Sequence, residues 1–513
     1  MLARVRSATI LGVDAHIVDV EVDVGAGLPA MATVGLAQSA VKEGKERVIA
    51  AIHNTGFELP PRRITINLAP ADIKKEGSHF DLPIALGLLV AAGQVSGERV
   101  GDYALAGELG LDGSLRPIRG ALPIAFAVQE AGIPGLLLPA GNVAEAAIVE
   151  GLDVRGAASF QDIVDFLTGR RELKRGEAAP ALDGGASGPA GVDLGDVRGQ
   201  VHAKRALEIA GAGAHNLLLI GPPGGGKTML ARRFPTILPR FSLAEAVEAT
   251  RVHSVAGQLS PGSGLLTQRP FRAPHHSISD AGLVGGGAVP RPGEVSLAHN
   301  GVLFLDELTE FRRNVLEVLR QPLEDGYVTI GRATGALTFP ARFVLVAAMN
   351  PCPCGHLGDP LRSCRCTPAM VRRYGAKVSG PLLDRFDLHV EVPPVSAPEL
   401  IDRVGEGPSS SEIRARVNEA RRLQKERFAE RRGLYANGQM GARDVGRYCS
   451  SDETALSLLR AAMGRFGLSA RSFHRVLKVA RTIADLDGTE GVCSTHVAEA
   501  LQYRDLDRSV LIG

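Results

Sequence analysis

The pattern of apolar and polar positions predicts a compact α+β domain at residues 1–167. His16–Val24 carries valine at every second position, as a half-buried strand does, whereas Ala40–Ile52 spaces its apolar residues as a helix does. The same criteria predict further strands at Arg63–Leu68 and Gly135–Pro139, a helix at Phe80–Ala92, and a strand-turn-strand at Tyr103–Leu115. Strands and helices therefore alternate throughout this part.

The rest of the chain divides into a linker and three further segments. Residues 168–192 have few apolar residues and no periodicity, which is typical of a flexible linker. Residues 193–395 alternate short apolar strands with helices and predict an α/β core with a parallel sheet. A basic helical insertion is expected at 396–445, opened by the capping box Ser409-x-x-Glu412, and a helical lid at 446–513.

One stretch of the core predicts a nucleotide site. The apolar run Leu217–Ile220 is followed by a G-x-x-x-x-G-K-T motif and then by a helix, the context that a phosphate-binding loop requires. Its glycines let backbone N–H groups turn toward a phosphate, and the helix dipole adds to them. Lys227 is expected to reach the β- and γ-phosphates of ATP, and Thr228 to hold Mg²⁺. The predicted cofactor contacts are Gly221, Pro222, Pro223, Gly224, Gly225, Gly226, Lys227, Thr228 and Met229.

A second signature lies about 80 residues further on. The apolar strand Val302–Leu305 runs into two carboxylates, Asp306 and Glu307, at the edge where open parallel sheets bind ligands. Asp306 is predicted to orient Mg²⁺. Glu307 is predicted to orient and polarise the attacking water, because hydrolysis needs a base within hydrogen-bond reach.

Four cysteines, Cys352, Cys354, Cys364 and Cys366, form two C-x-C pairs around a short polar loop. In a reducing compartment this pattern favours a structural tetrahedral Zn²⁺. Reduced thiols without a ligand and a disulfide are the alternatives. Because adjacent residues rarely chelate one ion, the paired histidines of Phe271–Asp280 predict an ordered loop rather than a metal site.

Charge is distributed unevenly. Residues 1–165 contain 13 Lys and Arg against 20 Asp and Glu, a net −7, whereas residues 166–513 contain 45 against 36, a net +9. The second part is thus the one suited to a polyanion. No apolar run is long enough for a membrane span and Met1–Arg6 does not resemble a signal peptide, so a cytoplasmic protein without a membrane partner is expected.

Two segments of the first domain, Glu76–Leu86 and Gly107–Gly120, resemble the core of Lon-type protease domains. The positions of the Ser–Lys dyad of those enzymes fall on His79 and near Leu122, so the resemblance implies a Lon-like fold without peptidase activity. His79 is expected to be a hydrogen-bonded core or interface histidine.

Three more segments, Phe271–Asp280, Pro290–Leu308 and Glu499–Arg504, resemble the ComM/YifB branch of the magnesium-chelatase-like AAA+ ATPases. The resemblance implies a homohexameric motor that drives branch migration or unwinding of single-stranded and branched DNA during homologous recombination and natural transformation, alongside recombinase machinery. A magnesium-chelatase motor subunit and a Lon-like protease are the alternatives.

The same resemblance assigns roles to further residues. It implies adenine contacts at Val197, Gly199 and Gln200, a γ-phosphate sensor at Asn350, and a finger inserted into a neighbouring subunit at Arg385. Arg385 has an alternative role in an intramolecular pair with Asp384 or Asp387. Arg471 matches the sensor-2 position, with Arg475 one turn later as the alternative. Arg291 and Arg332, the latter on a predicted hairpin, are DNA-contact candidates facing the pore.

Overall fold

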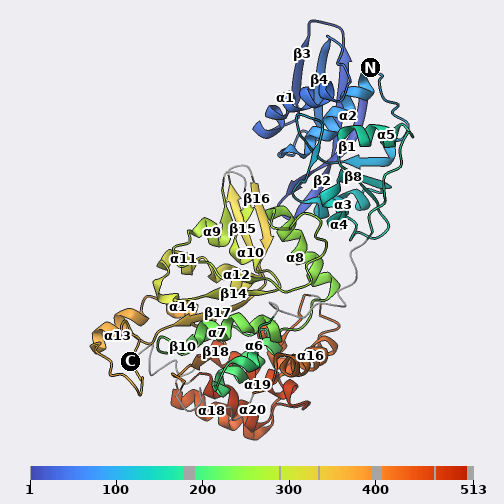
Figure 1. Ribbon diagram of the computed structural model, residues 1–513. Helices are drawn as coiled ribbons and strands as arrows, with labels where there is room; N and C mark the ends of the chain where they lie inside the picture. Colours follow the sequence, from blue (N-terminus) through green and yellow to red (C-terminus); the bar gives the residue numbers. More distant parts are fainter. Residues whose placement is uncertain are drawn as a thin grey trace.

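The computed structural model describes residues 2–177, 191–287, 290–332, 335–395, 407–431, 433–466 and 469–504. Figure 1 shows an elongated molecule in which the N-terminal domain, the α/β core and the C-terminal helices follow one another in sequence order. Among the described residues, no helix is both long and apolar enough to cross a membrane.

The N-terminal domain is built on a seven-stranded mixed sheet in the order β3-β4-β2-β1-β5-β8-β9. Its strands are β1 (Leu2–Leu11), β2 (Asp14–Gly25), β3 (Ala30–Val34), β4 (Arg63–Ala69), β5 (Tyr103–Leu105), β8 (Gly135–Pro139) and β9 (Asp153–Ala157), with a small ribbon β6 (Glu108–Leu109) and β7 (Leu115–Arg116). Its helices are α1 (Ser39–Asn54), α2 (Asp81–Ala91), α3 (Ala121–Glu130), α4 (Val143–Ala146) and α5 (Phe160–Leu167). The predicted α+β organisation is confirmed.

Strand β1 was not predicted, although it pairs with β2 along its whole length. Its first half alternates, with Ala3 and Val5 buried between exposed Arg4 and half-exposed Arg6. The alternation then ends, because the polar Ser7 and Thr9 are buried as well. A buried hydroxyl interrupts the period of two on which strand prediction rests.

Several buried polar groups of this domain bind partners within the domain. His79, 5% exposed, contacts the Ala8 carbonyl at 2.9 Å through Nε2, and burial lowers its pKa to about 4. The Asp81 carboxylate accepts a 3.0 Å hydrogen bond from Arg47, and Lys75 donates to the Pro70 carbonyl. Leu122 is fully buried. The expected core histidine is thus present, and the Lon-type likeness stays a prediction.

The beginning of the predicted linker lies against the N-terminal domain. Leu173 is 7% exposed, and the Gly176 amide donates a 2.8 Å hydrogen bond to the Val154 carbonyl of β9. The predicted linker also includes residues 178–190, which lie outside the described residues.

The α/β core contains a five-stranded parallel sheet in the order β11-β14-β17-β10-β18, with helices on both faces (Figure 1). The strands are β10 (Leu217–Ile220), β11 (Phe271–Arg272), β14 (Val302–Leu305), β17 (Val344–Met349) and β18 (Leu388–Glu391). The helices are α6 (Val201–Gly213), α7 (Lys227–Arg233), α8 (Leu243–Ala256), α9 (Asp280–Val284), α10 (Glu294–Leu297), α11 (Arg313–Glu317), α12 (Arg320–Asp325), α13 (Pro368–Gly375) and α14 (Gly380–Leu383). The predicted parallel core is confirmed.

Two antiparallel ribbons extend from this core. One pairs β12 (Gly285–Gly286) with β13 (Arg291–Pro292), and the other is the predicted hairpin of β15 (Tyr327–Arg332) and β16 (Gly335–Pro340). Arg291 is exposed. The side chain of Arg332 and residues 333–334 at the tip of the hairpin lie outside the described part of the structure.

The C-terminal region is helical, as predicted, with α16 (Ser410–Arg427), α17 (Ala442–Tyr448), α18 (Glu453–Phe466), α19 (Ala470–Leu486) and α20 (Ser494–Gln502). The capping box of Ser409 and Glu412 is present at the start of α16. Ile413, Val417 and Ala420 of α16 are buried in one core that also contains residues of α6 and α19. The predicted insertion residues 396–406 lie outside the described residues.

The N-terminal domain docks on α8 of the core. The Gly120 amide, just before α3, donates a 3.2 Å hydrogen bond to the Ser254 carbonyl, and the Ser254 hydroxyl donates to the buried carboxylate of Glu145. Arg251 pairs with Asp14 at 2.5 Å and lies over the ring of Phe126 at 5.2 Å. Backbone and side-chain contacts therefore join the two domains at α8, and the Gly262 amide in the loop after it donates a 2.9 Å hydrogen bond to the Gly141 carbonyl.

Candidate nucleotide site

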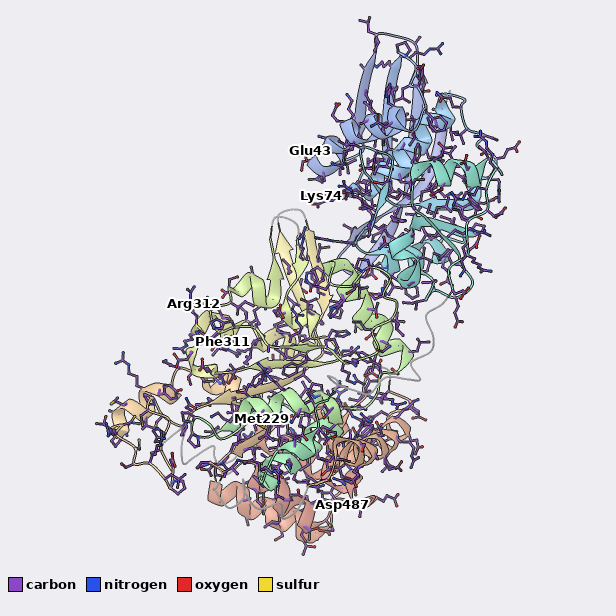
Figure 2. All side chains as sticks on the ribbon, in the orientation of Figure 1. Glu43, Lys74, Met229, Phe311, Arg312 and Asp487 are labelled. Atoms are coloured by element: carbon purple, nitrogen blue, oxygen red, sulfur yellow. The ribbon has the colours of Figure 1, made fainter. Side chains whose placement is uncertain are left out.

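The phosphate-binding loop follows β10 and leads into α7, as predicted. Gly224 and Gly226 have φ values of 81° and 89°, which side chains rarely tolerate. At Gly221 a Cβ atom would lie only 2.1 Å from the carbonyl oxygen of Val392, the residue that follows β18, so this position has no room for a side chain. Met229, labelled in Figure 2, is 47% exposed on α7.

Lys227 bridges the loop and the end of β17. Its Nζ donates to the carbonyls of Gly221 at 2.7 Å and Pro222 at 2.9 Å, and to Oδ1 of Asn350 at 3.2 Å. Burial lowers the pKa of this lysine, and the negative charge of Asp306 opposes the shift. Three acceptors thus fix the ammonium group beside the glycine-rich loop. The predicted sensor Asn350 lies at the same point.

Thr228 and Asp306 form the predicted pair for Mg²⁺. The threonine hydroxyl donates a 2.7 Å hydrogen bond to Oδ2 of Asp306, so the two oxygens lie at one place at the carboxyl edge of the sheet. A hydroxyl and a carboxylate are hard oxygen ligands, and Mg²⁺ is bound in proteins by one or two carboxylates together with waters and substrate phosphates. This donor set fits the ion.

Glu307 follows Asp306 in a left-handed backbone conformation with φ of 51°, which is uncommon for a residue with a side chain. Its amide donates to Oδ1 of Asp306 at 3.0 Å. Its carboxylate, 62% exposed, lies 3.5 Å from Nδ1 of His276. The two adjacent acidic side chains therefore have different surroundings: Asp306 is joined to the phosphate-binding helix, and Glu307 is largely exposed.

A cavity of about 600 Å³ connects these groups. Its lining consists of Lys227, Asp306, Glu307, Glu310, Ala348, Met349, Asn350, Pro353, Met370, Arg373, Tyr374 and Lys377. The last four come from α13 and the residues just after it, and sequence reasoning did not assign them. Tyr374 accepts a 2.6 Å hydrogen bond from the Thr309 hydroxyl, and Lys377 pairs with Glu310 at 3.5 Å. The cavity size and its cationic wall fit a nucleoside triphosphate.

The predicted adenine contacts lie beside the phosphate loop rather than in the lining of the cavity. Gln200, at φ of 53°, precedes α6 and donates to the carbonyls of Gly225 at 3.2 Å and Pro393 at 2.6 Å. Val197 is 4% exposed and packs in the core, and Gly199 has φ of 59°. Gln200 therefore joins the phosphate loop to the segment after β18.

Arg385 lies just before β18, at the sheet edge opposite the phosphate loop. Its side chain is 10% exposed and pairs with Glu324 of α12, not with the predicted Asp384 or Asp387. Asp387 instead binds His215 at 3.1 Å and Arg475 at 3.7 Å. The alternative of an intramolecular pair is thus realised with a different partner, because the chain brings α12 next to this edge.

Three arginines gather at that edge. Burial lowers the pKa of Arg385, and the charges of Arg475 and Arg471 lower it further. None of the three is among the residues that line the cavity described above. Arg385, the predicted finger, and Arg471, the predicted sensor of the lid, therefore lie at one edge of the sheet. The phosphate loop lies at the opposite edge.

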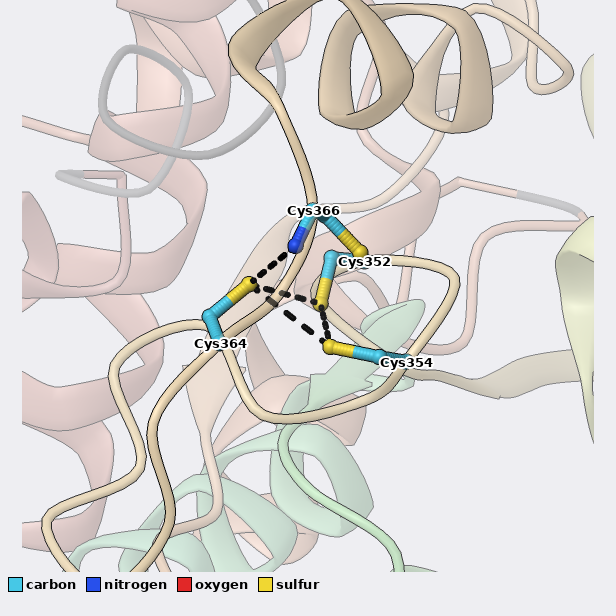
Figure 3. Close-up of side chains that lie close together, drawn as sticks. All are labelled: Cys352, Cys354, Cys364 and Cys366. Atoms are coloured by element: carbon cyan, nitrogen blue, oxygen red, sulfur yellow. Dashed lines mark hydrogen bonds between the residues drawn. The ribbon is translucent and has the colours of Figure 1, made fainter.

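The four predicted cysteines converge in the loop between β17 and α13 (Figure 3). Their sulfurs lie within 4.8 Å of one another, and three of the Sγ–Sγ distances are 3.4, 3.6 and 3.7 Å. Zn–S bonds of about 2.3 Å in a tetrahedron place sulfurs about 3.8 Å apart, so the cluster fits Zn²⁺. All four are free of disulfide bonds. Among the described residues, no other group of three or more metal-binding side chains is as close, and the rings of His275 and His276 lie side by side at a tilt of 33°, with centroids 4.1 Å apart.

Comparison with known families matches most of the chain. Residues 193–400 match the family described as magnesium chelatase, subunit ChlI, residues 20–142 match subunit ChlI of Mg-chelatase, and residues 407–504 match its C-terminal part. The chain is 44% identical over 508 residues to competence protein ComM of Haemophilus influenzae, covering 99% of this chain and 98% of that protein. It is 43% identical over 510 residues to the uncharacterized protein YifB of Escherichia coli, again covering 99% and 98%. It is 26% identical over 324 residues to the 38 kDa magnesium-chelatase subunit of Rhodobacter capsulatus, covering 58% of this chain and 82% of that one.

Proposed function

The chain belongs to the ComM/YifB family of magnesium-chelatase-like AAA+ ATPases, and from this premise we propose that it is a DNA motor. The proposed motor is a homohexamer that couples ATP hydrolysis to branch migration of DNA in homologous recombination and natural transformation. The full-length similarity to a protein named for competence supports this role. The proposed location is the cytoplasm, where single-stranded and branched DNA and the recombinase machinery would be its partners.

The separation of the two halves of the catalytic machinery carries the proposal. Lys227, Thr228 and Asp306 lie at one edge of the sheet, whereas Arg385 and Arg471 gather at the other. Arginine charge at the γ-phosphate accelerates related phosphotransfer reactions by about 10³–10⁵. A chain whose arginines face away from its own cavity obtains that charge from a neighbouring copy, so the active form is a closed ring.

Within one site the residues have distinct tasks. Lys227 neutralises phosphate charge after exchanging its carbonyl partners for phosphate oxygens, and Thr228 with Asp306 would hold Mg²⁺, which neutralises charge on the β- and γ-phosphates. Glu307 orients the attacking water and accepts its proton. Asn350, bound to Lys227, would touch the γ-phosphate.

DNA contact is proposed at the two ribbons of the core. Arg291 is exposed on β13, and the hairpin of β15 and β16 carries Arg332 toward its tip. Arginines that hold phosphates bind without regard to sequence, and their affinity falls with salt. The net charge of +9 in residues 166–513 supports the same surface.

The four-cysteine loop is proposed to hold a structural zinc ion. Cys352 and Pro353 follow Asn350 closely, and Cys366 precedes α13, whose residues form one wall of the nucleotide cavity. In addition, a Cβ atom at Gly355 would lie 2.6 Å from Pro223 of the phosphate loop, so the cysteine loop packs on the nucleotide site. A tetrahedral zinc ion would therefore fix the sensor strand and α13 relative to each other.

A motor subunit of magnesium chelatase is the second candidate, because family descriptions of that enzyme match three parts of the chain. The chelatase subunit, however, aligns with only 58% of the chain, whereas the ComM and YifB proteins align with 99%. The DNA motor is accordingly the better-supported function.

The deciding experiment measures ATP turnover with and without forked DNA at low salt. We expect forked DNA to raise the turnover number several-fold, with Lys227→Ala inactive in both conditions. If forked DNA does not change the rate of ATP turnover, the proposed DNA motor is wrong. That result would favour a motor that needs protein partners. Imaging with an ATP analogue and forked DNA tests the ring, which requires six copies around the nucleic acid.

A further inference from the structure

A second cavity, of about 470 Å³, lies where the C-terminal helices meet the α/β core. Its core wall contains Asn216, just before β10, and Val344, the first residue of β17, so it lies at the edge where the parallel strands begin. Its other wall comes from α16, α19 and the loop 433–441, and Figure 1 shows both helices below the sheet. None of its described lining residues also lines the nucleotide cavity, which lies at the opposite edge.

Two cationic side chains of the C-terminal helices line this cavity. Arg421 of α16 donates to the carbonyls of Gly211 at 3.2 Å and Tyr435 at 3.3 Å. Lys478 of α19 donates to the Gly438 carbonyl at 3.0 Å. In the described part of the chain, neither cation forms an ion pair with a carboxylate. Burial is the main cause that lowers the pKa of both, that of Arg421 to about 10.

Most of the acidic side chains in the lining already have partners. These acidic residues are Glu245, Glu324, Asp325 and Asp387. Glu245 pairs with Arg269 at 2.9 Å, and Arg269 has a larger effect on the pKa of Arg421 than Glu245 has. Glu324 pairs with Arg385, and Asp325 is exposed. Asp387 pairs with His215 and Arg475, so it is shared among three groups when Lys478 is included.

The loop that holds the two cations is itself fixed in place. The Asn437 amide donates a 3.0 Å hydrogen bond to Oε1 of Gln424, and its side chain donates to Oδ2 of Asp485 at 2.8 Å. A Cβ atom at Gly438 would lie 2.6 Å from the Ala214 carbonyl oxygen, so the loop lies directly on the end of α6. The two cationic groups are therefore held at the cavity before any ligand binds.

An aromatic ring lies at the exposed side of the same cavity. Tyr435 is 51% exposed, and the guanidinium group of Arg342 lies over its ring, 5.9 Å from the centroid. Both residues belong to the cavity lining. An exposed aromatic ring beside an arginine offers a flat surface on which the ring or apolar body of a ligand can stack.

These features together suit a ligand that carries a phosphate group. Burying a cation without a counter-charge is unfavourable, and an anion in the cavity would remove that cost. A phosphate monoester carries a charge of about −1.5 to −2 near pH 7, which matches two cations better than one carboxylate does. The guanidinium group also fits phosphate oxygens bidentately. The volume of about 470 Å³ lies within the range of about 300–1,000 Å³ of small-molecule sites.

We propose that this cavity is a second ligand site, which binds a small organic phosphate with its phosphate group at Arg421 and Lys478 and its body against Tyr435. The bound molecule would touch both the α/β core and the C-terminal helices, and would hold the two together. This site is separate from the phosphate loop, and the inference goes beyond the DNA motor and does not depend on it.

Calorimetric titration of full-length Lys227→Ala protein with AMP tests the site, because this background weakens the phosphate loop. In that background, Arg421→Gln and Lys478→Met should each weaken AMP binding by about tenfold or more, since each removes one charge that faces the phosphate group. Failure of AMP to bind the background protein would overturn the proposal. Equal affinity in the Arg421→Gln protein would overturn it as well.

Arg422→Gln is the matched control for the arginine of the cavity. Arg422 follows Arg421 on α16, but it pairs with Glu419 at 2.7 Å and with Glu426 at 2.5 Å and is not part of the lining. AMP should bind this variant as it binds the background protein. A loss of binding as large as that of Arg421→Gln would mean that the net charge of the helix, rather than the cavity, attracts the ligand.

Pyrophosphate separates an organic phosphate from a free phosphate ion, because it has no ring to place on Tyr435. We expect AMP to bind about tenfold more tightly than pyrophosphate, and Tyr435→Ala to remove this difference without changing the affinity for pyrophosphate. Equal affinities for the two probes in the Lys227→Ala background would overturn the assignment to an organic phosphate.

Thermal unfolding distinguishes a ligand-binding role of Arg421 from a structural one. Saturating AMP should raise the Tm of the Lys227→Ala protein by about 3 °C or more. The Arg421→Gln protein should unfold within about 2 °C of the background without ligand, because a buried charge is lost together with its hydrogen bonds, and AMP should not raise its Tm. A lowered Tm with an unchanged response to AMP would show that Arg421 only supports the fold.

Discussion

The N-terminal domain and the ATPase core each bury a lysine that donates to backbone carbonyls, and the two lysines differ in what lies beyond them. Lys75 is fully buried, and its ammonium donates to Pro70. Lys227 donates to Gly221 and Pro222 in the same manner, yet it also lines a cavity of about 600 Å³. Burial lowers the pKa of both. The lowered pKa is thus common to both lysines, and the adjoining cavity is what distinguishes Lys227.

Two carboxylates, Asp81 of the N-terminal domain and Asp306 of the core, differ in the same way. Asp81 is held by Arg47, and burial, the largest effect, raises its pKa to about 6 despite that partner. Asp306 accepts hydrogen bonds from two neutral donors, the Thr228 hydroxyl and the Glu307 amide, which leaves its charge available to a cation. Asp81 and Lys75 have their partners within the first domain, whereas Asp306 and Lys227 of the core lie at a cavity that can take a ligand. Five predictions test this difference, in order of their effect on ATP turnover.

Arg385→Ala should have the largest effect. Removing arginine charge from the transition state is expected to lower turnover by about 10³–10⁵ while ATP binding is kept. Turnover and nucleotide binding are measured separately. Arg320→Ala, which removes an exposed arginine paired with Glu317 on the same side, is the control and should remain near wild type.

Mixing subunits shows whether Arg385 acts across an interface. An Arg385→Ala subunit keeps an intact phosphate loop, and a Lys227→Ala subunit keeps an intact Arg385. Where these two subunits meet in the right order, the interface contains one complete site. The mixture of these two inactive variants should regain part of the turnover. A mixture as inactive as its components would place Arg385 in its own chain's site.

Glu307→Gln is expected to lower hydrolysis by about 10²–10⁴, because an amide cannot accept the proton of the attacking water. ATP should remain bound, so rings should persist in its presence, as size-exclusion chromatography would show. Glu310→Gln is the matched control, since Glu310 lines the same cavity. Equal losses in the two variants would mean that cavity charge, rather than a base at Glu307, supports the reaction.

Cys364→Ser should abolish stoichiometric zinc in metal analysis. It should also weaken ATP binding by about tenfold, equivalent to about 1.4 kcal/mol, because α13 loses its fixed position beside the cavity. Cys493→Ser, far from this loop in the sequence at the start of α20, should change neither quantity. Wild-type protein free of zinc after purification in metal-replete medium would contradict a zinc site.

His79→Phe should leave ATP turnover within twofold and change the pH dependence of stability of the N-terminal domain. His79 is neutral in the folded state down to a pKa of about 4, whereas in the unfolded chain it binds a proton below about 6.5. The unfolded state therefore binds more protons between these values, and stability falls by up to about 3 kcal/mol as pH drops from 6.5 to 4.

Hydrogen exchange of the α2 amides in the intact protein, corrected for intrinsic rates, measures that stability. The variant should lose this part of the pH slope, while the opposite contribution of Asp81, whose folded pKa is raised, remains. An unchanged slope would mean that His79 is not the group responsible.

The parts of the site that the sequence predicts are those encoded by contiguous residues. The run from Leu217 to Thr228 specifies strand, loop and helix locally, and Val302–Glu307 does the same for the second strand end. The four cysteines were also recognisable because their spacing is short. At these positions the residues that carry the chemistry are also the residues that determine the local backbone structure.

The remaining parts depend on contacts between distant segments. Arg373 and Lys377 reach the cavity only because the cysteine loop turns α13 back over it, and nothing in α13 itself indicates a nucleotide. The partner of Arg385 is Glu324, which lies 61 positions earlier and becomes a neighbour through the packing of α12. Hydrophobic periodicity and short sequence motifs say nothing about which distant segments of the chain pack together, so neither contact could be predicted.

The docking of the N-terminal domain on α8 has a mechanical consequence. Through its last turns α8 touches α10 as well, since Nε2 of His253 lies 2.9 Å from the carbonyl of Leu297, the last residue of α10. The chain then continues into β14, which Asp306 and Glu307 follow. The carboxylate of Glu145 and the hydroxyl of Ser254 are both buried at the joint. In the proposed ring, the N-terminal domain of each copy would follow any displacement of its own α8, because these buried contacts couple the two.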